Sequence, residues 1–297
     1  MTRITQQGRT AGINADLQLA GSRLSKIQRQ VASGRQIERP SDAPAVALEA
    51  LRYRRTLRTY GQYDRNLDDA KNWLGSADSA LQAVDSRIRR AQDLTIQAEN
   101  GALSPTARQA IAVELRSIAD ELVDLANTEH LDRPIFSGTS GASAAYQTDG
   151  TYLGDAGTVS RTISSGTTVQ VNLTGEEIFG ASDPADPANG NLFEFIRSVA
   201  DDIDAGVSVG AALTGFSAAQ DRVHTAQAAL GSRLGTVERV ENRNLDVSLD
   251  LNSSLSKVED VDLSQAIVQL RADEASYQAA LGITGRILQN SLLDFLR

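Results

Sequence analysis

The pattern with the clearest chemical meaning is the run Gly206-Val-Ser208-Val-Gly210, which matches the Gly-x-Ser-x-Gly element of serine hydrolases. Asp221 and His224 lie nearby and could supply the other members of a catalytic triad. The element works only where a strand turns sharply into a helix, because that turn lifts the serine above a sheet. Residues 193–204 are instead patterned as an amphipathic helix. We therefore interpret the run as a loop between helices, and a serine hydrolase using Ser208 stays a remote alternative.

Residues that bind metals are scattered along the chain. Asp183, Asp186 and Asn189 share one loop, but they lack the alternating acids and the closing Glu of a calcium-binding loop. His130 and His224 are the only two histidines, and with no Cys in the chain neither has a thiolate to share a metal with. Phosphate-binding and dinucleotide-binding fingerprints are also missing. We predict no catalytic residues, no cofactor and no metal, and a protein that is not an enzyme.

Composition points to a helical protein with few large side chains. Of 297 residues only 4% are aromatic, so the contacts must come from Ala, Leu, Ile and Val, which suits long helices packed side by side. A net charge of −9 and a pI near 4.9 argue against a nucleic-acid partner, whose phosphates require clustered Lys and Arg. No run approaches the ~20 apolar residues of a membrane span, and no secretory signal is visible at the N-terminus.

Apolar residues recur in alternating steps of four and three at both ends of the chain, as on one seam of a coiled-coil helix. The N-terminal set begins about a dozen residues from Met1 and consists of Ile13, Leu17, Ala20, Leu24, Ile27 and Val31. The matching C-terminal set is Leu263, Ile267, Leu270, Tyr277, Leu281, Leu288, Leu292 and Phe295. Two helical arms that pair would run antiparallel, because the chain between them leaves near residue 40 and returns near residue 257. We predict both sets as an assembly interface, while a simple coiled coil that closes the fold remains open.

Glu274 interrupts the C-terminal seam. It either fixes the register by pairing with a basic residue or lies in water at the edge of the seam, and both interpretations stay open.

A hinge is predicted between the first arm and the body. Gly34 ends the first helix, Pro40 prevents helix before it, and Ser41 or Asp42 caps a helix with Pro44 in its first turn. From Tyr53 the seam runs without a slip to Ala98. A helix continuous from Asp42 to Asn100 would be about 90 Å long at ~1.5 Å per residue. Ser104 and Pro105 start a helix that folds back along it.

The remaining pattern completes the fold class. Residues 136–191 are rich in Gly, Ser, Thr and Asp and show short alternating apolar runs, with Asp149-Gly150 and Ser165-Gly166 as hairpin turns. Helical periodicity returns at Leu192 and again after Ser217. We predict a mainly α chain with a small β-rich insertion, built as an elongated antiparallel helical rod with N- and C-terminal coiled-coil arms. The predicted domains are the arms at 1–40 with 257–297, the rod at 41–135 with 192–256, and the insertion at 136–191.

Several short runs resemble the flagellin superfamily. They are Arg3-Ile-Thr5, Ala32-Ser-Gly-Arg-Gln-Ile37, Pro40-Ser-Asp-Ala-Pro44, Asn127 with Ile135-Phe-Ser-Gly-Thr139, and the ending Ser291-Leu-Leu-Asp-Phe-Leu-Arg297. The Pro-Ser-Asp-x-Pro hinge and the Phe-Ser-Gly-Thr exit are most similar to the hook-associated branch of that superfamily. Two departures are Ala43, where a second Asp is common, and Arg133-Pro134, where a Gly-Tyr-like pair is common. The resemblance covers roughly residues 1–140 and 190–297.

The resemblance implies a structural protein of the bacterial flagellum, at the junction between the hook-associated zone and the filament. It implies self-association through the arms, a second hook-associated protein on the hook side, flagellin on the filament side, and an export chaperone on the C-terminal arm. It also implies an extracellular protein exported without a cleaved signal peptide through the flagellar type III apparatus. Flagellin itself is the nearest alternative, and a helical adhesin or phage structural protein is a third.

The arms are predicted to be largely disordered in an isolated monomer. Ordering the backbone costs about 1–2 kcal/mol per residue, whereas each buried Leu returns only about 1.5–3 kcal/mol. A single seam on a two-helix arm scarcely offsets that cost, so neighbouring copies must add apolar surface.

Overall fold

A computed structural model describes residues 2–37, 39–99, 103–183, 185–186, 188 and 190–295. Side chains are described from Ala11 to Arg286 within these ranges, and at Gly8. The chain divides into two compact units. Unit 1 is Met1–Thr59 with Val247–Arg297, and unit 2 is Tyr60–Asp246. The division into arms, rod and insertion at the predicted boundaries stays a prediction.

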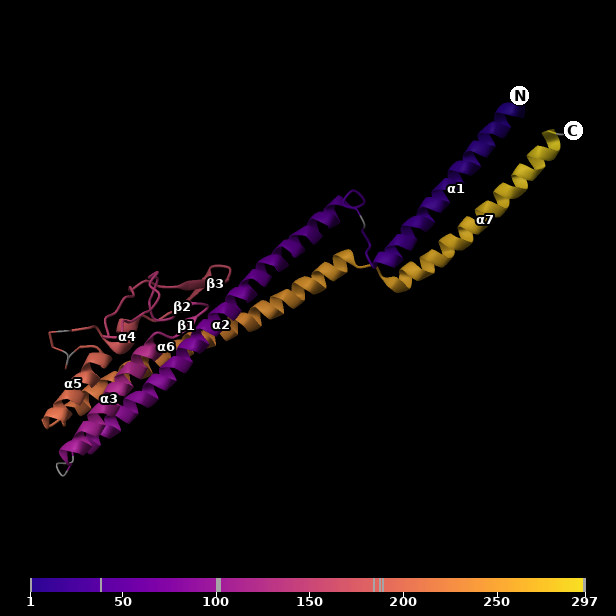
Figure 1. Ribbon diagram of the computed structural model, residues 1–297. Helices are drawn as coiled ribbons and strands as arrows, with labels where there is room; N and C mark the ends of the chain where they lie inside the picture. Colours follow the sequence, from indigo (N-terminus) through magenta and orange to yellow (C-terminus); the bar gives the residue numbers. More distant parts are fainter. Residues whose placement is uncertain are drawn as a thin grey trace. The chain divides into compact units, whose positions relative to one another are not determined.

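Long helices make up most of both units, and the predicted fold class, mainly α with a small β-containing insertion, is confirmed (Figure 1). The helices are α1 (Thr2–Ser33), α2 (Pro44–Glu99), α3 (Pro105–Ala126), α4 (Gly175–Phe179), α5 (Leu192–Ala205), α6 (Ala212–Glu259) and α7 (Leu263–Phe295). Helices α2 and α6 each begin in one unit and end in the other.

Helix α2 is one continuous helix, as the unbroken seam predicts. From Leu67 to Thr95 every residue of that seam is buried, in steps of four and three, by the other elements of unit 2. The predicted inner face of α6 is likewise buried or half-buried from Leu230 to Leu255. These faces contain only aliphatic residues and small polar ones, so the packing along them is made by Leu, Ile, Val and Ala.

Helix α3 folds back along α2. Its first turn follows the predicted chemistry, since Ser104 Oγ accepts a hydrogen bond from the Ala107 N–H at 3.2 Å and Pro105 is the first helical residue. Ion pairs then join the two helices in antiparallel order, Arg90 with Glu114 at 2.6 Å and Arg87 with Glu121 at 3.0 Å. The apolar face of α3 is buried, and α3 also packs against α5.

The insertion holds less regular structure than its alternating pattern predicts. Strands β3 (Ser160–Ser164) and β4 (Thr167–Gln170) form the expected hairpin around Ser165-Gly166, with Gly166 at φ +75°. The predicted Asp149-Gly150 turn closes only a single bridge between Tyr146 and Tyr152. A second ladder, β1 (Glu129–His130) with β2 (Arg133–Pro134), lies before the predicted start of the insertion. Helix α4 was not predicted.

Aromatic packing compensates for the short strands. Tyr146, Phe179 and Phe193 stack edge to face or tilted, with ring centroids 5.0–5.6 Å apart. Phe136 joins them through Phe179 at 5.8 Å. These rings come from loops, α4 and α5, so a sequence with few aromatics places half of its phenylalanines in one cluster that fixes the insertion on the helices of unit 2.

In unit 1, α1 and α7 lie side by side and run antiparallel (Figure 1). Backbone hydrogen bonds join the segment that follows α1 to the segment that precedes α7. The Val261 N–H donates to the Gly34 carbonyl at 3.0 Å, and the Gln36 N–H donates to the Glu259 carbonyl at 2.7 Å. Among the described side chains of these two helices, only Ile27 and Ala266 are buried apolar residues. The pair therefore has very little interior of its own.

Candidate assembly interface

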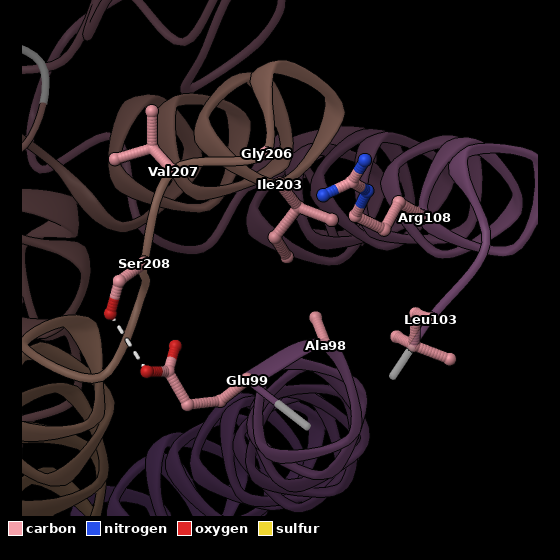
Figure 2. Close-up of a pocket in the computed structure, with 8 residues that line it drawn as sticks. All are labelled: Ala98, Glu99, Leu103, Arg108, Ile203, Gly206, Val207 and Ser208. Atoms are coloured by element: carbon pink, nitrogen blue, oxygen red, sulfur yellow. Dashed lines mark hydrogen bonds between the residues drawn. The ribbon is translucent and has the colours of Figure 1, made fainter. Parts of the chain in front are cut away.

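The Gly-x-Ser-x-Gly run forms the loop that follows α5 (Figure 2). Gly206 ends α5 in the left-handed region at φ +74°. Ser208 Oγ then donates a hydrogen bond to Glu99 Oε1 at 2.7 Å, and the Val209 N–H donates to Glu99 Oε2 at 2.8 Å. These hydrogen bonds, that of Ser208 above all, lower the pKa of Glu99. The serine thus anchors the loop to the last residue of α2.

The other triad candidates lie elsewhere. His224 Nε2 is 3.3 Å from Asp85 Oδ1, so it too faces α2. Asp85 precedes Glu99 by fourteen residues, about 21 Å along the helix at ~1.5 Å per residue. Ser208 and His224 therefore contact α2 at distant points, and the structure does not bring the predicted triad together. A cavity of ≈ 190 Å³ beside Ser208, lined also by Arg108 and Ile203, is smaller than the ~300–1,000 Å³ of ordinary ligand sites (Figure 2).

The metal candidates are equally dispersed. His130 Nε2 is 3.9 Å from Asp69 Oδ1, and its ring packs against the edge of Trp73. Asp183 Oδ1 accepts hydrogen bonds from the backbone N–H groups of Ala185 and Asp186, which shapes its own loop, while Asn189 lies outside the described residues. No group of three or more ligand side chains gathers anywhere in the described part of the chain.

The N-terminal seam faces α7. Each of its members is buried or half-buried, whereas most residues between them are exposed. The members are Ile13, Leu17, Ala20, Leu24, Ile27 and Val31. Gly21 lies beside the seam, and a Cβ there would come within 3.3 Å of the Tyr277 ring, so this glycine gives the tyrosine room against α1.

The C-terminal seam divides between two faces. Leu270 and Tyr277 are half-buried on the side that meets α1. Leu263, Ile267 and Leu281 are 51%, 43% and 46% exposed. The side chains of Leu288, Leu292 and Phe295 lie outside the described residues.

The residues that α7 turns toward α1 form a different repeat of fours and threes. It consists of Ala266, Leu270, Asp273, Tyr277, Ala280 and Thr284, all buried or half-buried. The two repeats share Leu270 and Tyr277, so apolarity alone favours the one with more leucines. Small residues two heptads apart, Ala266 and Ala280, were the signal for the register that packs within one chain. Glu274 is exposed, and the half-buried acid is Asp273, which accepts a hydrogen bond from Gln269 Nε2 at 3.0 Å.

The hinge residues separate α1 from α2. Gly34 follows the last residue of α1 at φ +69°, a conformation that favours glycine. Pro44 is the first residue of α2, as predicted. The predicted cap is wrong, because Asp42 Oδ2 accepts instead from the Arg39 N–H at 3.3 Å, and the Ala43 carbonyl receives the first helical hydrogen bond. Pro40 and Ser41 form the intervening turn.

Residues that carry the resemblance outside the arms hold the insertion in place. Asn127 ends α3, accepts from the Tyr146 N–H at 2.8 Å and donates to the Tyr146 carbonyl at 2.9 Å. Gly138 adopts φ +69°, where a Cβ would strike Asp155. The Thr139 N–H and hydroxyl both donate to the Asp155 carboxylate. These residues fix a chain path, so their chemistry is structural.

Fold and sequence together define the class of protein. Residues 5–140 match the bacterial flagellin N-terminal helical region. In structure the chain is similar to FlgL of Bacillus cereus, with a TM-score of 0.60 and 25% identity over 69% of this chain and 99% of that one. It shares the fold of flagellar hook-associated protein 3 of Legionella pneumophila, with a TM-score of 0.61 and 16% identity over 69% and 98%. The predicted kinship with flagellin-type proteins of the bacterial flagellum is confirmed.

Within this class, similarity along the chain is to flagellar hook-associated protein 3. That protein of Escherichia coli is 26% identical over 88% of this chain and 90% of its own length, and that of Salmonella typhimurium is 26% identical over 89% and 91%. Flagellins match a shorter part: polar flagellin C of Vibrio parahaemolyticus is 30% identical over 43% of this chain. The comparison therefore favours a structural protein of the hook-associated kind over a filament subunit.

Within the described ranges, no helix combines the length and the apolar character that crossing a bilayer requires.

Proposed function

We propose that this chain is a subunit of the hook–filament junction and assembles through its terminal arms. The observation that carries the proposal is the double apolar character of α7. One repeat of fours and threes meets α1, and Leu263, Ile267 and Leu281 of the other are left about half exposed. Apolar residues that repeat at coiled-coil spacing on an exposed helix face form a surface that a neighbouring helix would cover.

The proposal extends to partners and location. The chain self-associates in a ring or helical assembly, with a second hook-associated protein on the hook side and flagellin on the filament side. It reaches the outside of the cell through the flagellar export apparatus without cleavage, and a chaperone covers the exposed leucines of α7 before export. The proposal includes no nucleic-acid partner and no insertion into a membrane. The similarity to hook-associated proteins over nearly the whole chain supports this position over that of a bulk flagellin.

A catalytic role has no support from the site. Ser208 donates its hydrogen bond to Glu99, and His224 contacts Asp85 instead, so the imidazole expected of a catalytic triad does not reach the hydroxyl. We therefore propose that the protein is not an enzyme and that the Gly-x-Ser-x-Gly loop is structural.

Deletion of the gene tests the position in the flagellum. We expect cells that build hooks, lack filaments and release flagellin monomers into the medium. Cells that still build attached filaments would contradict the junction role. Purified protein that polymerises alone into long tubes would instead favour a flagellin.

A set of substitutions tests the exposed face of α7. Changing Leu263, Ile267 and Leu281 together to Ser should raise released flagellin at least tenfold, because the free repeat loses its apolar residues. The matched control changes Val113, Leu131 and Val207, which are also exposed but lie in unit 2, to Ser and should leave filaments intact. Equal effects of the two triple variants would show that the arms have no special role.

A further inference from the structure

Helix α2 carries an unusual outward face just after the hinge. Leu48 and Leu51 are both more than half exposed, and Arg52 and Arg55 lie on the same side at helical spacing. Neither arginine makes a side-chain ion pair or hydrogen bond within the described part of the chain. In a protein of net charge −9 this face is both apolar and positively charged. We call Leu48, Leu51, Arg52 and Arg55 the basic face.

A recess adjoins the basic face. It has a volume of ≈ 180 Å³ and an apolar floor that includes Ile37, Ala47 and Leu51. Arg54 also lines it, but this arginine pairs with Glu259 at 2.7 Å. The recess is too small for the ~300–1,000 Å³ of a drug-sized ligand, so it suits a protein side chain.

Helix α6 carries the opposite combination. Leu245 and Leu249 are both more than half exposed and lie one turn apart. Asp246 and Asp250 flank them, are exposed, and make no ion pair among the described residues. These two aspartates are the only charged residues between Asn244 and Lys257. We call Leu245, Asp246, Leu249 and Asp250 the acidic face.

One molecule cannot pair its own two faces. Where α2 and α6 meet in unit 1, they do so through other residues, such as Arg54 with Glu259 and Tyr53 with Ser254. Leu48 lies nearly half a turn from that inner side of α2, and Leu51 lies about a quarter turn from it, at the edge of the recess. On α6, Leu249 lies about half a turn from the inner Leu251. Both faces therefore point outward, and only a second molecule can bring them together.

We propose that the basic face of one copy docks on the acidic face of a second copy of this chain. The leucines of the two faces pack together, and each aspartate pairs with an arginine. Such a contact joins two different patches, so it is head-to-tail and generates a ring or a helical array. Four residues a side fall far short of the ~1,600 Å² of a stable interface. The contact therefore acts together with the arms, and it rests on the proposed assembly function.

Disulfide trapping tests the contact, because the native chain has no cysteine and gives no background. The double variant Leu51→Cys with Leu249→Cys is expressed as the full chain, and isolated flagella are treated with a mild oxidant. We expect a ladder of dimers and larger species on denaturing gels. The matched control pairs Leu249→Cys with Val113→Cys, an equally exposed residue of α3, and should give at least tenfold less cross-linked product.

Charge reversal supplies a second measurement. Arg52→Glu with Arg55→Glu should reduce cross-linking at least tenfold, and adding Asp246→Arg with Asp250→Arg should restore at least half of it. Circular dichroism of each variant checks that the helices remain.

The outcomes separate the two proposals. If the chain is present in isolated flagella but the ladder does not exceed the control, the docking of these faces is wrong and the junction role stands. Cross-linking of Leu51→Cys to a different flagellar protein would also overturn docking on a second copy. If the unsubstituted chain is absent from flagella, the junction role fails and this contact fails with it.

Discussion

A serine in a hydrolase-like pattern here performs a structural task. Gly206 provides the left-handed residue that ends α5, and Ser208 and Val209 return two hydrogen bonds to Glu99. Glycine at a helix end and serine as a donor are ordinary needs of a short connection between helices. The same residue types satisfy the motif even where no strand precedes them. The motif alone therefore could not distinguish a catalytic nucleophile from a serine that holds a loop by a hydrogen bond.

Ser208→Ala distinguishes these two roles. The hydrogen bonds lower the pKa of Glu99 in the folded state, so they stabilise the fold above the ordinary pKa of Glu. That contribution is lost as pH falls through the lowered pKa. Removing the hydroxyl should move the pKa of Glu99 back toward its ordinary value, as measured by NMR titration of its side chain. The control Ser79→Ala, on the surface of α2, should leave that pKa unchanged. Loss of an esterase activity in Ser208→Ala would instead revive the hydrolase.

At the scale of elements, long periodic helices could be predicted and the insertion only in part. The α2 seam holds because Leu74, Leu81 and Ile88 repeat over many turns and no rival register offers equal burial. In α7 two registers compete. Leucine content favours one of them, but Ala266 and Ala280, which belong to the other, face α1. Strands of two residues and the five-residue α4 are too short for an apolar pattern to repeat. Their positions depend on aromatic contacts that sequence spacing does not reveal.

Two glycines of α6 should respond oppositely to alanine. At Gly231 nothing lies within 4 Å of an added Cβ, so Gly231→Ala should stabilise the helix by about 1 kcal/mol. At Gly215 a Cβ would come within 2.5 Å of the Phe195 ring, and such overpacking costs about 1–3 kcal/mol. Thermal denaturation should therefore show a Tm about 2–4 °C higher for Gly231→Ala and a lower one for Gly215→Ala. A rise for both variants would mean that Phe195 moves aside freely.

At the scale of the whole molecule, burial is unevenly distributed between the two units. Apart from Ile27, Ala50 and Ala266, every buried apolar residue of the described side chains belongs to unit 2. Unit 2 can therefore fold by its own core, whereas nearly all described apolar residues of α1 and α7 are half-buried or exposed. This uneven burial is expected of a subunit whose terminal helices pack against neighbouring copies, because the apolar contacts that these helices lack must come from outside the chain.

The last prediction follows from that division. Ordering the backbone costs about 1–2 kcal/mol per residue, and a fully buried Leu, Ile or Val returns about 1.5–3 kcal/mol. Helices α1 and α7 together order 65 residues, 32 and 33, while Ile27 and Ala266 are their only buried apolar side chains among those described. In dilute monomer, the amides of residues 265–286 should therefore exchange with solvent at nearly the unfolded rate, while those of residues 111–123 in α3 exchange slowly. In isolated flagella both segments should be protected. Slow exchange of residues 265–286 in a verified monomer would show that the arms are stable alone, and assembly would then need a driving force other than the completion of their interior.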